Sequence, residues 1–242
     1  MRKNSKIMIR FNIISKLKKM KKLLLLMSVA LSFNMVASAQ YIALSFDDGP
    51  NTTTTPKVLD LLEENGVKAS FFVIGQNITP ESAVVMQRAA KMGCTIENHS
   101  FTHKYMSRMD EKTLIEEIAK TDALIEHYVG RTPQFFRPPY INHGKLMHDT
   151  IAKTFICGVG CNDWEASVSA EQRLETMLST IKNGDIFLLH DFEGNEATVE
   201  ALRKLIPEMK KRGFIFVTVP EIFELNGKAP QAHDGEIYTN VL

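Results

Sequence analysis

Two adjacent carboxylates, Asp47 and Asp48, end the apolar run Tyr41–Phe46 and stand directly before Gly49 and Pro50. The run predicts a β-strand, and the Gly-Pro pair predicts the turn that ends it. Successive side chains of a strand point in opposite directions, so one carboxylate can hold a metal ion while the other accepts a proton. Standing alone, such a pair is more typical of an acidic turn. Its meaning therefore depends on the rest of the chain.

A second group of polar side chains, residues 97–103, follows the expected strand Cys94–Glu97. If Ser100 begins a helical turn, His99 and His103 face the same way and can bind one ion through both imidazoles. An isolated pair with this spacing is more typical of solvated or buried histidines. Joined with Asp48, the pair supplies two nitrogens and one carboxylate oxygen. This ligand set leaves coordination positions open for water.

Three more groups come directly after expected strands, or close one. They are Arg137-Pro138-Pro139-Tyr140, Asp163-Trp164 and Leu188-Leu189-His190. Each has a plain structural reading by itself, because proline loops carry surface arginines and a lone tryptophan is more often part of a core. All of these groups, however, fall at the same end of their strands. In a barrel of parallel strands those ends meet at one mouth.

Short apolar runs alternate with segments of helical period, which predicts an α/β fold with parallel strands. We expect strands at Tyr41–Phe46, Ala69–Ile74, Cys94–Glu97, Gln134–Phe136, Phe155–Val159, Asp185–Leu189 and Phe214–Val217, and helices at Lys57–Asn65, Glu81–Met92, Glu111–Tyr128 and Glu196–Arg212. Seven βα units favour a barrel over an open doubly wound sheet. No linker or repeat indicates a second domain. We expect a catalytic domain over 40–226 and a surface tail over 227–242.

The N-terminus has the composition of a secretory signal peptide over residues 1–39. A basic segment precedes the apolar stretch Leu23–Val36 and the small residues Ala37-Ser38-Ala39, and Met20 is an alternative start. The apolar stretch is short for a membrane span, so we expect an exported protein, periplasmic or secreted, with no transmembrane segment in the mature chain. Cleavage would remove nine Lys or Arg and no acidic residue, which leaves 20 basic and 28 acidic residues and a formal charge of −8.

The charge of the mature chain excludes a general affinity for nucleic acid. Three cysteines, Cys94, Cys157 and Cys161, do not form a disulfide framework. We expect mostly buried thiols. Cys157 and Cys161 lie too far apart along an extended segment to be bridged.

The motifs together resemble the polysaccharide deacetylases of carbohydrate esterase family 4, the NodB-like homology domain. The similarity runs from about Tyr41 to Val219. It implies a distorted (β/α)7 barrel that holds a divalent metal ion, usually taken to be Zn²⁺, with Co²⁺ or Ni²⁺ as alternatives. The residues that match the family's roles are Asp48, His99 and His103 for the metal, Asp47 for the catalytic base, Arg137 for the arginine that orients this base and keeps it ionised, and His190 with Asp163 for the general acid and its partner.

The same resemblance implies an oxyanion contact from a backbone N–H near Tyr140. It also implies a small pocket for the acetyl methyl group, lined by Leu188 and Trp164. The chain departs from the family pattern at three places: Gly160 replaces a common aspartate, Glu97 replaces a small residue, and Ile141 stands where a glycine often follows the tyrosine. These departures remove none of the assigned roles, but they leave substrate choice and the tuning of Arg137 open.

We therefore expect an exported, monomeric, metal-dependent deacetylase whose partner is an acetylated glycan. The expected bonds are the N-acetyl groups of N-acetylglucosamine units, as in chito-oligosaccharides or peptidoglycan. An O-acetyl xylan esterase is the nearest alternative, because the same metal and base attack either an amide or an ester. An alternative of a different class is a glycan-binding module without turnover. Binding alone does not require a paired base and acid, which argues against that class.

Overall fold

The computed structural model describes residues 39–242, in which parallel strands alternate with helices. The strands are β1 (Gln40–Asp47), β2 (Ser70–Val73), β3 (Thr95–Asn98), β4 (Phe135–Phe136), β5 (Thr154–Ile156), β6 (Val159–Gly160), β7 (Ile186–His190), β8 (Phe214–Val217) and β9 (Ile237–Tyr238). The helices are α2 (Thr54–Asn65), α3 (Pro80–Lys91), α4 (Glu111–Val129), α5 (Lys145–Thr150), α6 (Ala170–Thr180), α7 (Glu196–Lys211) and α8 (Val219–Leu225), with short 3-10 turns η1 (Gly75–Asn77), η2 (Met106–Arg108) and η3 (Pro139–Ile141).

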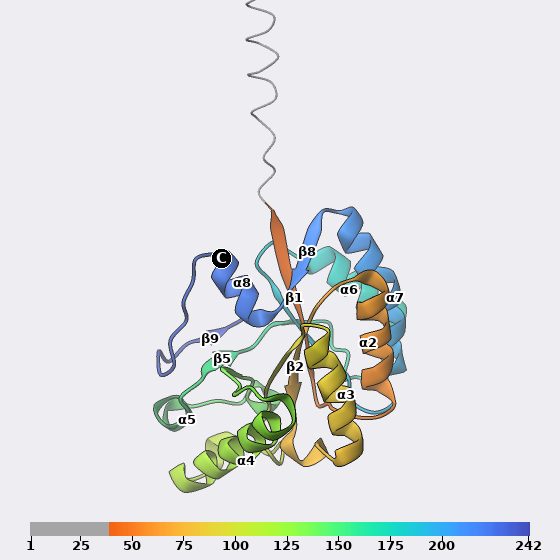
Figure 1. Ribbon diagram of the computed structural model, residues 1–242. Helices are drawn as coiled ribbons and strands as arrows, with labels where there is room; N and C mark the ends of the chain where they lie inside the picture. The colour runs from red at the N-terminus through yellow and green to blue at the C-terminus, as the bar shows by residue number, and fades with distance from the viewer. Residues whose placement is uncertain (1–38) are drawn as a thin grey trace, which may run out of the picture. The chain divides into compact units, whose positions relative to one another are not determined.

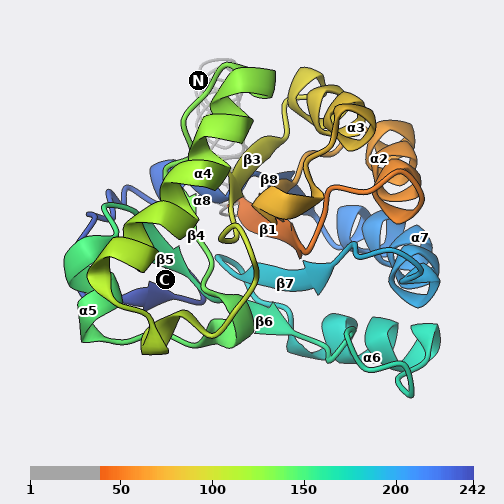
Figure 2. The same cartoon turned by 90° about the horizontal axis from the view of Figure 1, so that it is seen from below.

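The strands form one sheet in the order β6-β7-β1-β2-β3-β4-β5-β9, with β8 paired to β1. Ala43 lies opposite both Val217 of β8 and Ile186 of β7, so β1 exchanges one neighbour for the other at this residue. Seen from below, the strands lie at the centre, and α2, α3, α4, α6 and α7 surround them (Figure 2). The expected barrel of parallel strands is confirmed, and the change of neighbour along β1 accounts for part of its distortion.

The expected strand Phe155–Val159 is not continuous, because it breaks at Cys157 and Gly158. Its first part, β5, pairs with β4, and its second part, β6, pairs with β7. Gly158 has a φ of 136°, and a Cβ there would lie 2.9 Å from the Cβ of Leu188. Only glycine allows this close passage. The break lets one segment join two distant sides of the sheet and curl it into a barrel.

Alternation along β1 separates two environments. Ile42, Leu44 and Phe46 belong to the large cluster that packs with buried residues of α2, α3 and α7, whereas Ala43 belongs to the cluster inside the barrel. Because side chains alternate, Asp47 has the parity of Ala43 and lies inside the barrel at its C-terminal end. Figure 1 shows β1 running through the middle of the molecule, with α2 and α7 beside it.

The C-terminal segment is more integrated than a surface tail. β9 pairs with β5, Asp185 forms an antiparallel bridge with Asn240, and Val241 is buried. Within 39–242 no helix is long and apolar enough to cross a membrane. Residues 1–38 of the expected signal peptide lie outside the described residues. Cys94, Cys157 and Cys161 are free thiols, and Cys94 and Cys161 are buried, as expected.

Candidate active site

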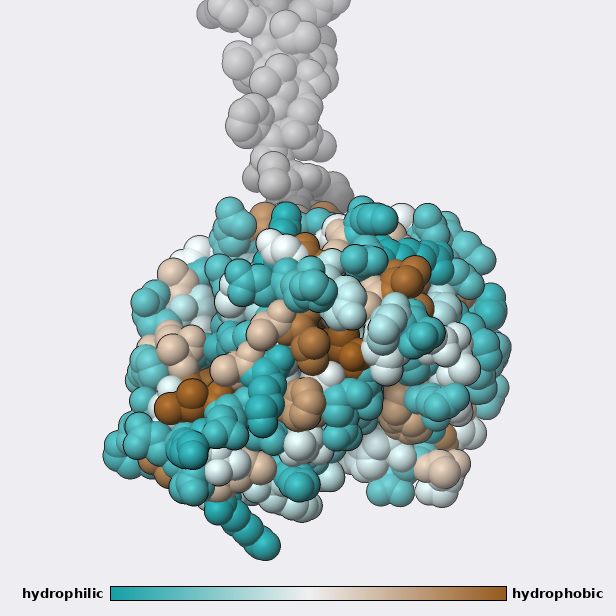
Figure 3. Space-filling view, turned by 60° about the horizontal axis from the view of Figure 1, so that its bottom comes forward, coloured by the Kyte–Doolittle hydropathy of each residue, from teal (hydrophilic) through white to brown (hydrophobic). Residues whose placement is uncertain are grey.

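The predicted site residues gather at the C-terminal ends of the strands. A cavity of about 810 Å³ opens there, and its walls include Asp48, His103, Tyr140 and Phe192. The lower face of the molecule, which Figure 3 turns toward the viewer, is mainly hydrophilic with separate hydrophobic patches.

Asp47 at the end of β1 is held by Arg137, which follows β4. Arg137 Nη1 donates to Asp47 Oδ1 at 2.6 Å, and Nη2 donates to Ser45 Oγ at 2.8 Å. Ser45 in turn donates to the carbonyl of Phe187. Arg137 is fully buried, and its guanidinium lies 4.2 Å from the ring centroid of Phe72. A buried ion pair with these contacts fixes the direction of one carboxylate oxygen.

Asp48, His99 and His103 converge. Their ligand atoms lie within 4.8 Å of one another. Asp48 Oδ1 is 3.6 Å from His99 Nε2 and 3.3 Å from His103 Nε2. His99 Nδ1 contacts the carbonyl oxygen of Arg137 at 2.6 Å. A carbonyl only accepts, so Nδ1 carries the hydrogen and the Nε2 lone pair of the neutral ring points toward Asp48.

The expected helical turn between the histidines is wrong. No helix forms at residues 99–103, and Ser100 and His103 instead have φ values of 65° and 56°. Glu117 of α4 holds this turn, since its carboxylate accepts from the N–H groups of Phe101 and Thr102 at 3.0 and 2.8 Å. The ring centroids of His99 and His103 are nevertheless only 4.9 Å apart. A left-handed turn anchored from α4 brings the imidazoles together.

The chemistry of this triad suits a divalent cation. Burial opposes ionisation of Asp48, yet the close approach of the His99 ring and the positive charge that His99, His190 and His103 can carry lower its pKa to about 2. Burial and the neighbouring His99 lower the pKa of His103, which favours the neutral form that binds metals. Asp48 Oδ1 is buried without a hydrogen-bond partner among the described residues. A cation would satisfy this oxygen.

His190 ends β7 opposite Asp47. His190 Nδ1 and Asp163 Oδ1 are 2.7 Å apart, and the His190 N–H donates to Asp163 Oδ2 at 2.7 Å. Burial opposes the charged imidazole, but the hydrogen bond and charge of Asp163 outweigh it and raise the pKa of His190 to about 9. The pair therefore holds a proton at neutral pH beside the carboxylates of β1.

Asp191, the next residue, is also buried and was not singled out by its sequence context. Thr55 Oγ1 donates to Asp191 Oδ2 at 2.5 Å, and Oδ1 has no partner among the described residues. Burial and the charges of Asp48 and Asp47 raise the pKa of Asp191 to about 7 despite the hydrogen bond from Thr55. A Cβ at Gly49 would lie 2.7 Å from Asp191 Oδ2, so this contact requires glycine.

Trp164 and Leu188 lie beside His190. The Trp164 ring is half exposed and meets the His190 ring edge-on, with centroids 5.6 Å apart. Leu188 is buried. A Cβ added to Gly160 would stand 3.7 Å from the Trp164 ring. The glycine at this departure from the family pattern therefore leaves open the space next to the tryptophan.

Tyr140 projects from η3, where its φ is 59°. The centroid of its ring lies 4.7 Å from the centroid of the His103 ring. The Tyr140 ring also stacks on the Tyr105 ring, with centroids 4.2 Å apart and an angle of 14° between the ring planes. Tyr105 and Tyr140 are 52% and 56% exposed. The sequence analysis did not single out Tyr105. Its place two residues after His103 was the available signal.

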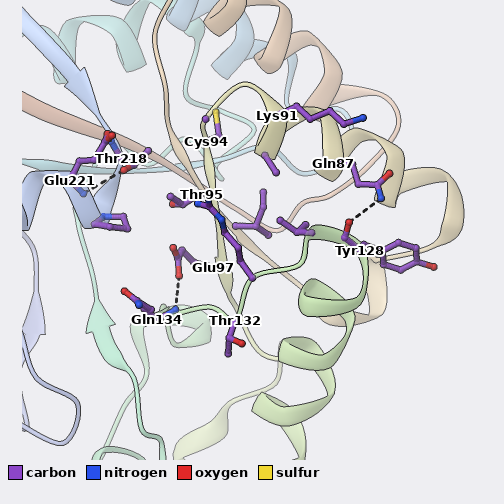
Figure 4. A pocket seen from close by; sticks show the side chains of 16 residues that line it. Gln87, Lys91, Cys94, Thr95, Glu97, Tyr128, Thr132, Gln134, Thr218 and Glu221 are labelled. Atoms are coloured by element: carbon purple, nitrogen blue, oxygen red, sulfur yellow. Dashed lines mark hydrogen bonds between the residues drawn. The ribbon is translucent and has the colours of Figure 1, made fainter.

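Glu97 does not line the cavity beside Asp48. Its carboxylate accepts from the N–H groups of Gln134 and Phe135 at 3.1 and 3.0 Å and so fixes the start of β4. It borders a separate hollow of about 730 Å³ that is also lined by residues of α3 and the start of α8 (Figure 4). This departure from the family pattern acts on packing between strands.

Comparison with known proteins agrees with this geometry. The family model for polysaccharide deacetylase matches residues 35–155. The chain is 47% identical to a bifunctional xylanase/deacetylase of Pseudobutyrivibrio xylanivorans over 83% of its own length and 33% of that protein, and thus spans about a third of that relative. It is 35% identical to a peptidoglycan-N-acetylglucosamine deacetylase of Bacillus cereus over 76% of this chain and 68% of that protein.

The fold is also shared with a solved structure. A family 4 acetyl xylan esterase from Clostridium thermocellum, in complex with a cobalt ion, superposes with a TM-score of 0.81 and 38% identity. The match covers 84% of this chain and 99% of that one.

Proposed function

Because the chain belongs to the polysaccharide deacetylase family, we propose that it is an exported enzyme that hydrolyses acetyl groups of a glycan at the cavity beside Asp48. The single observation that carries the proposal is that a metal-type triad, an arginine-held carboxylate and a histidine paired with a buried aspartate lie together at the C-terminal ends of the strands. A glycan-binding module does not require these three features in combination.

We propose that Asp48, His99 and His103 hold the cation, with Zn²⁺ as the first candidate and Co²⁺ or Ni²⁺ as alternatives. Bound there, a divalent cation supplies Lewis acidity toward the acetyl carbonyl and acidifies a water molecule. The tautomer of His99 is set by the Arg137 carbonyl, so its free nitrogen is already directed at the site. This orientation lowers the cost of binding.

Asp47 is the proposed general base. Arg137 occupies its Oδ1, which leaves Oδ2, 3.6 Å from His99 Nε2, on the side of the triad. From there it accepts the proton of the attacking water. The N–H of Tyr140, whose backbone in η3 is left-handed, is the proposed donor to the oxyanion. Leu188 and Trp164 are the proposed walls of the acetyl pocket.

His190 is the proposed general acid. When the tetrahedral intermediate breaks, the bond between the carbonyl carbon and the leaving atom cleaves, and His190 gives its proton to the departing nitrogen or oxygen. Asp163 supports the charged imidazole at 2.7 Å. An amine leaves poorly without a proton, so a histidine that stays protonated at neutral pH is suited to amide hydrolysis as well as to ester hydrolysis.

Two substrate classes follow from different observations. The acid pair His190–Asp163 supports N-acetyl groups of N-acetylglucosamine glycans, as does the similarity to a peptidoglycan deacetylase. The 47% identity to a xylanase/deacetylase and the TM-score of 0.81 to an acetyl xylan esterase favour O-acetyl groups of xylan. We place acetylated xylan beside N-acetylated glycans as an equal candidate for that reason.

Acetate release tests the proposal. Protein purified as residues 40–242, tested for folding by circular dichroism, is treated with chelator and then given Zn²⁺, Co²⁺ or Ni²⁺. It is offered acetylated xylan, chito-oligomers and peptidoglycan. We expect acetate from at least one glycan with metal and none with chelator, whereas Asp47→Asn and His103→Ala should be inactive. Folded, metal-supplied protein that binds these glycans but releases no acetate would show the alternative class, a binding module.

Export is proposed from the basic-apolar-small order of residues 1–39. The full-length chain produced in a secreting bacterium should be shortened by about this segment outside the cytoplasm. Mass spectrometry of the exported protein would locate the cut, and mass spectrometry of the uncleaved precursor would show whether translation began at Met20.

A further inference from the structure

Behind the His190–Asp163 pair lies a buried arginine that no part of the proposed mechanism uses. Arg173 belongs to α6 and is 3% exposed. Its guanidinium makes four hydrogen bonds, all to neutral oxygens: to Val168 O at 2.9 Å, Glu165 O at 3.1 Å, Asn195 Oδ1 at 2.6 Å and Thr198 Oγ1 at 2.9 Å. A buried cation held only by dipoles is costly. Its retention calls for an explanation.

Two of these partners are in contact with Asp163. Thr198 Oγ1 is 2.8 Å from Asp163 Oδ2, and Asn195 Nδ2 is 3.5 Å from the same oxygen. Asn195 Nδ2 also donates to the carbonyl of His190 at 2.8 Å. Arg173 therefore reaches both residues that surround the carboxylate on the side away from the His190 ring.

The chemistry of the donors gives this contact a direction. A guanidinium can only donate, so the Thr198 oxygen must accept from Arg173, and its single hydrogen is left for Asp163. By the same rule, Arg173 fixes Asn195 with its oxygen toward the guanidinium and its NH₂ group toward His190 and Asp163. Without Arg173 the Thr198 hydroxyl can rotate and the Asn195 amide can turn over. Asp163 would then keep the backbone N–H of His190 on Oδ2 but lose both side-chain donors, which also help to keep its Oδ1 aimed at His190 Nδ1.

The other two bonds act on the same pair through the backbone. Glu165 and Val168 lie in the loop that follows Asp163 and Trp164, so Arg173 ties this loop to α6. The fork of the guanidinium thus joins the loop, α6 and the start of α7 at one point. Only arginine offers several donors in a rigid plane, and a lysine would reach fewer of these acceptors.

We infer that Arg173 is a positioning residue for the proton-donating His190, acting through Thr198, Asn195 and Asp163. The inference rests on the proposed role of His190 in the deacetylation. It assigns Arg173 no contact with substrate or cation. Its effect is confined to the step in which the leaving group receives a proton.

Leaving-group dependence separates positioning from a general loss of structure. Arg173→Met should lower kcat/KM about 10- to 100-fold on the acetylated glycan that the wild-type protein uses, the range for residues that orient a reacting group from behind. On 4-nitrophenyl acetate, whose leaving group departs without a proton, the loss should be far smaller. A protein that is merely less folded loses both activities by the same factor.

A double-mutant cycle completes the test. In a His190→Asn background, Arg173→Met should cause no further loss on the glycan, because the proton donor is already gone. Arg173→Lys should not restore the glycan activity, and Thr198→Val should lower it in the same direction if Arg173→Met fails to fold. Arg212→Met is the matched control, since Arg212 donates to Leu178 O at the other end of α6 and should leave both activities unchanged.

Equal losses on both substrates, or the same loss with and without His190, would overturn the inference. Full rescue by lysine would do so as well, because it would show that charge alone matters. A wild-type protein that releases no acetate from any glycan would instead contradict the proposed function, so the two failures are distinguishable.

Discussion

Replacing Asp191 with asparagine removes a buried acid that is ionised in the unfolded chain and protonated in the fold near pH 6. Its pKa rises from 3.8 to about 7 on folding. Between these two pH values the folded protein binds one more proton than the unfolded chain. The free energy of unfolding therefore falls as pH rises from about 4 to 7, and it stays at the lower value above pH 7. A shift of about three units corresponds to about 4 kcal/mol at pH 8, and to less than half of that at pH 5.

The Asp191→Asn variant lacks this penalty while keeping the size of the side chain. Its free energy of unfolding relative to wild type should therefore increase by about 2 to 3 kcal/mol between pH 5 and pH 8, and its melting temperature at pH 8 should be higher by roughly 10 °C. Urea unfolding at both pH values measures the difference. Chelator is included, because a bound cation would offset the charges of Asp48 and Asp47.

Asp149→Asn is the control, because Asp149 is an exposed partner of Lys145 on the surface. Its stability relative to wild type should change little with pH. Parallel stability curves for wild type and Asp191→Asn across this range would refute the reasoning, because they would show that Asp191 is already ionised in the folded protein.

Three further changes test the site. His190→Asn should lower acetate release from an N-acetylated oligomer about 100- to 10,000-fold and spare 4-nitrophenyl acetate. Because the hydrogen bond and charge of Asp163 raise the pKa of His190 above its ordinary value, wild-type activity on the oligomer should decline only at alkaline pH, as His190 loses its proton. A decline that persists in the variant would contradict the assignment. Tyr105→Ala should raise KM for oligomers about 2- to 12-fold, which corresponds to the loss of one stacking contact between the ring and the glycan. The KM for 4-nitrophenyl acetate should not change. An equal change in both KM values would show that the tyrosine does not contact the glycan. Zn²⁺ at 100 times its dissociation constant should raise the free energy of unfolding by about 2.7 kcal/mol, and His103→Ala should abolish this increase in thermal unfolding; an increase of the same size in the variant would place the ion elsewhere.

The sequence was sufficient for the parts of the fold that local pattern controls. The apolar run in Tyr41–Phe46 predicted a strand with Asp47 at its end, and the structure has β1 there. The shared position of Arg137, Asp163 and His190 after their strands predicted their convergence, because parallel strands end on one side. Arg137 contacts Asp47, His190 contacts Asp163, and Asp47 lies opposite His190 in the sheet, which agrees with that expectation.

Features that depend on distant residues could not be predicted. The turn between His99 and His103 is held by Glu117, and no local signal marks Ser100 for a positive φ. The break at Gly158 is required by the close approach of β7, whose residues lie far along the chain. Helix α6 was also not predicted, although its capping box at Ser169 and Gln172 is a local signal that marks the start of a helix.

The anchoring of the histidine turn by Glu117 links two events that lie in different parts of the molecule. One carboxylate on α4 holds the main chain between two proposed ligands, so any excursion that lifts α4 from the sheet also disperses the site. Linkage is reciprocal, so occupancy of the site must make such excursions less favourable by the same free energy. Hydrogen exchange in α4 therefore measures cation affinity, and it does so without substrate or turnover.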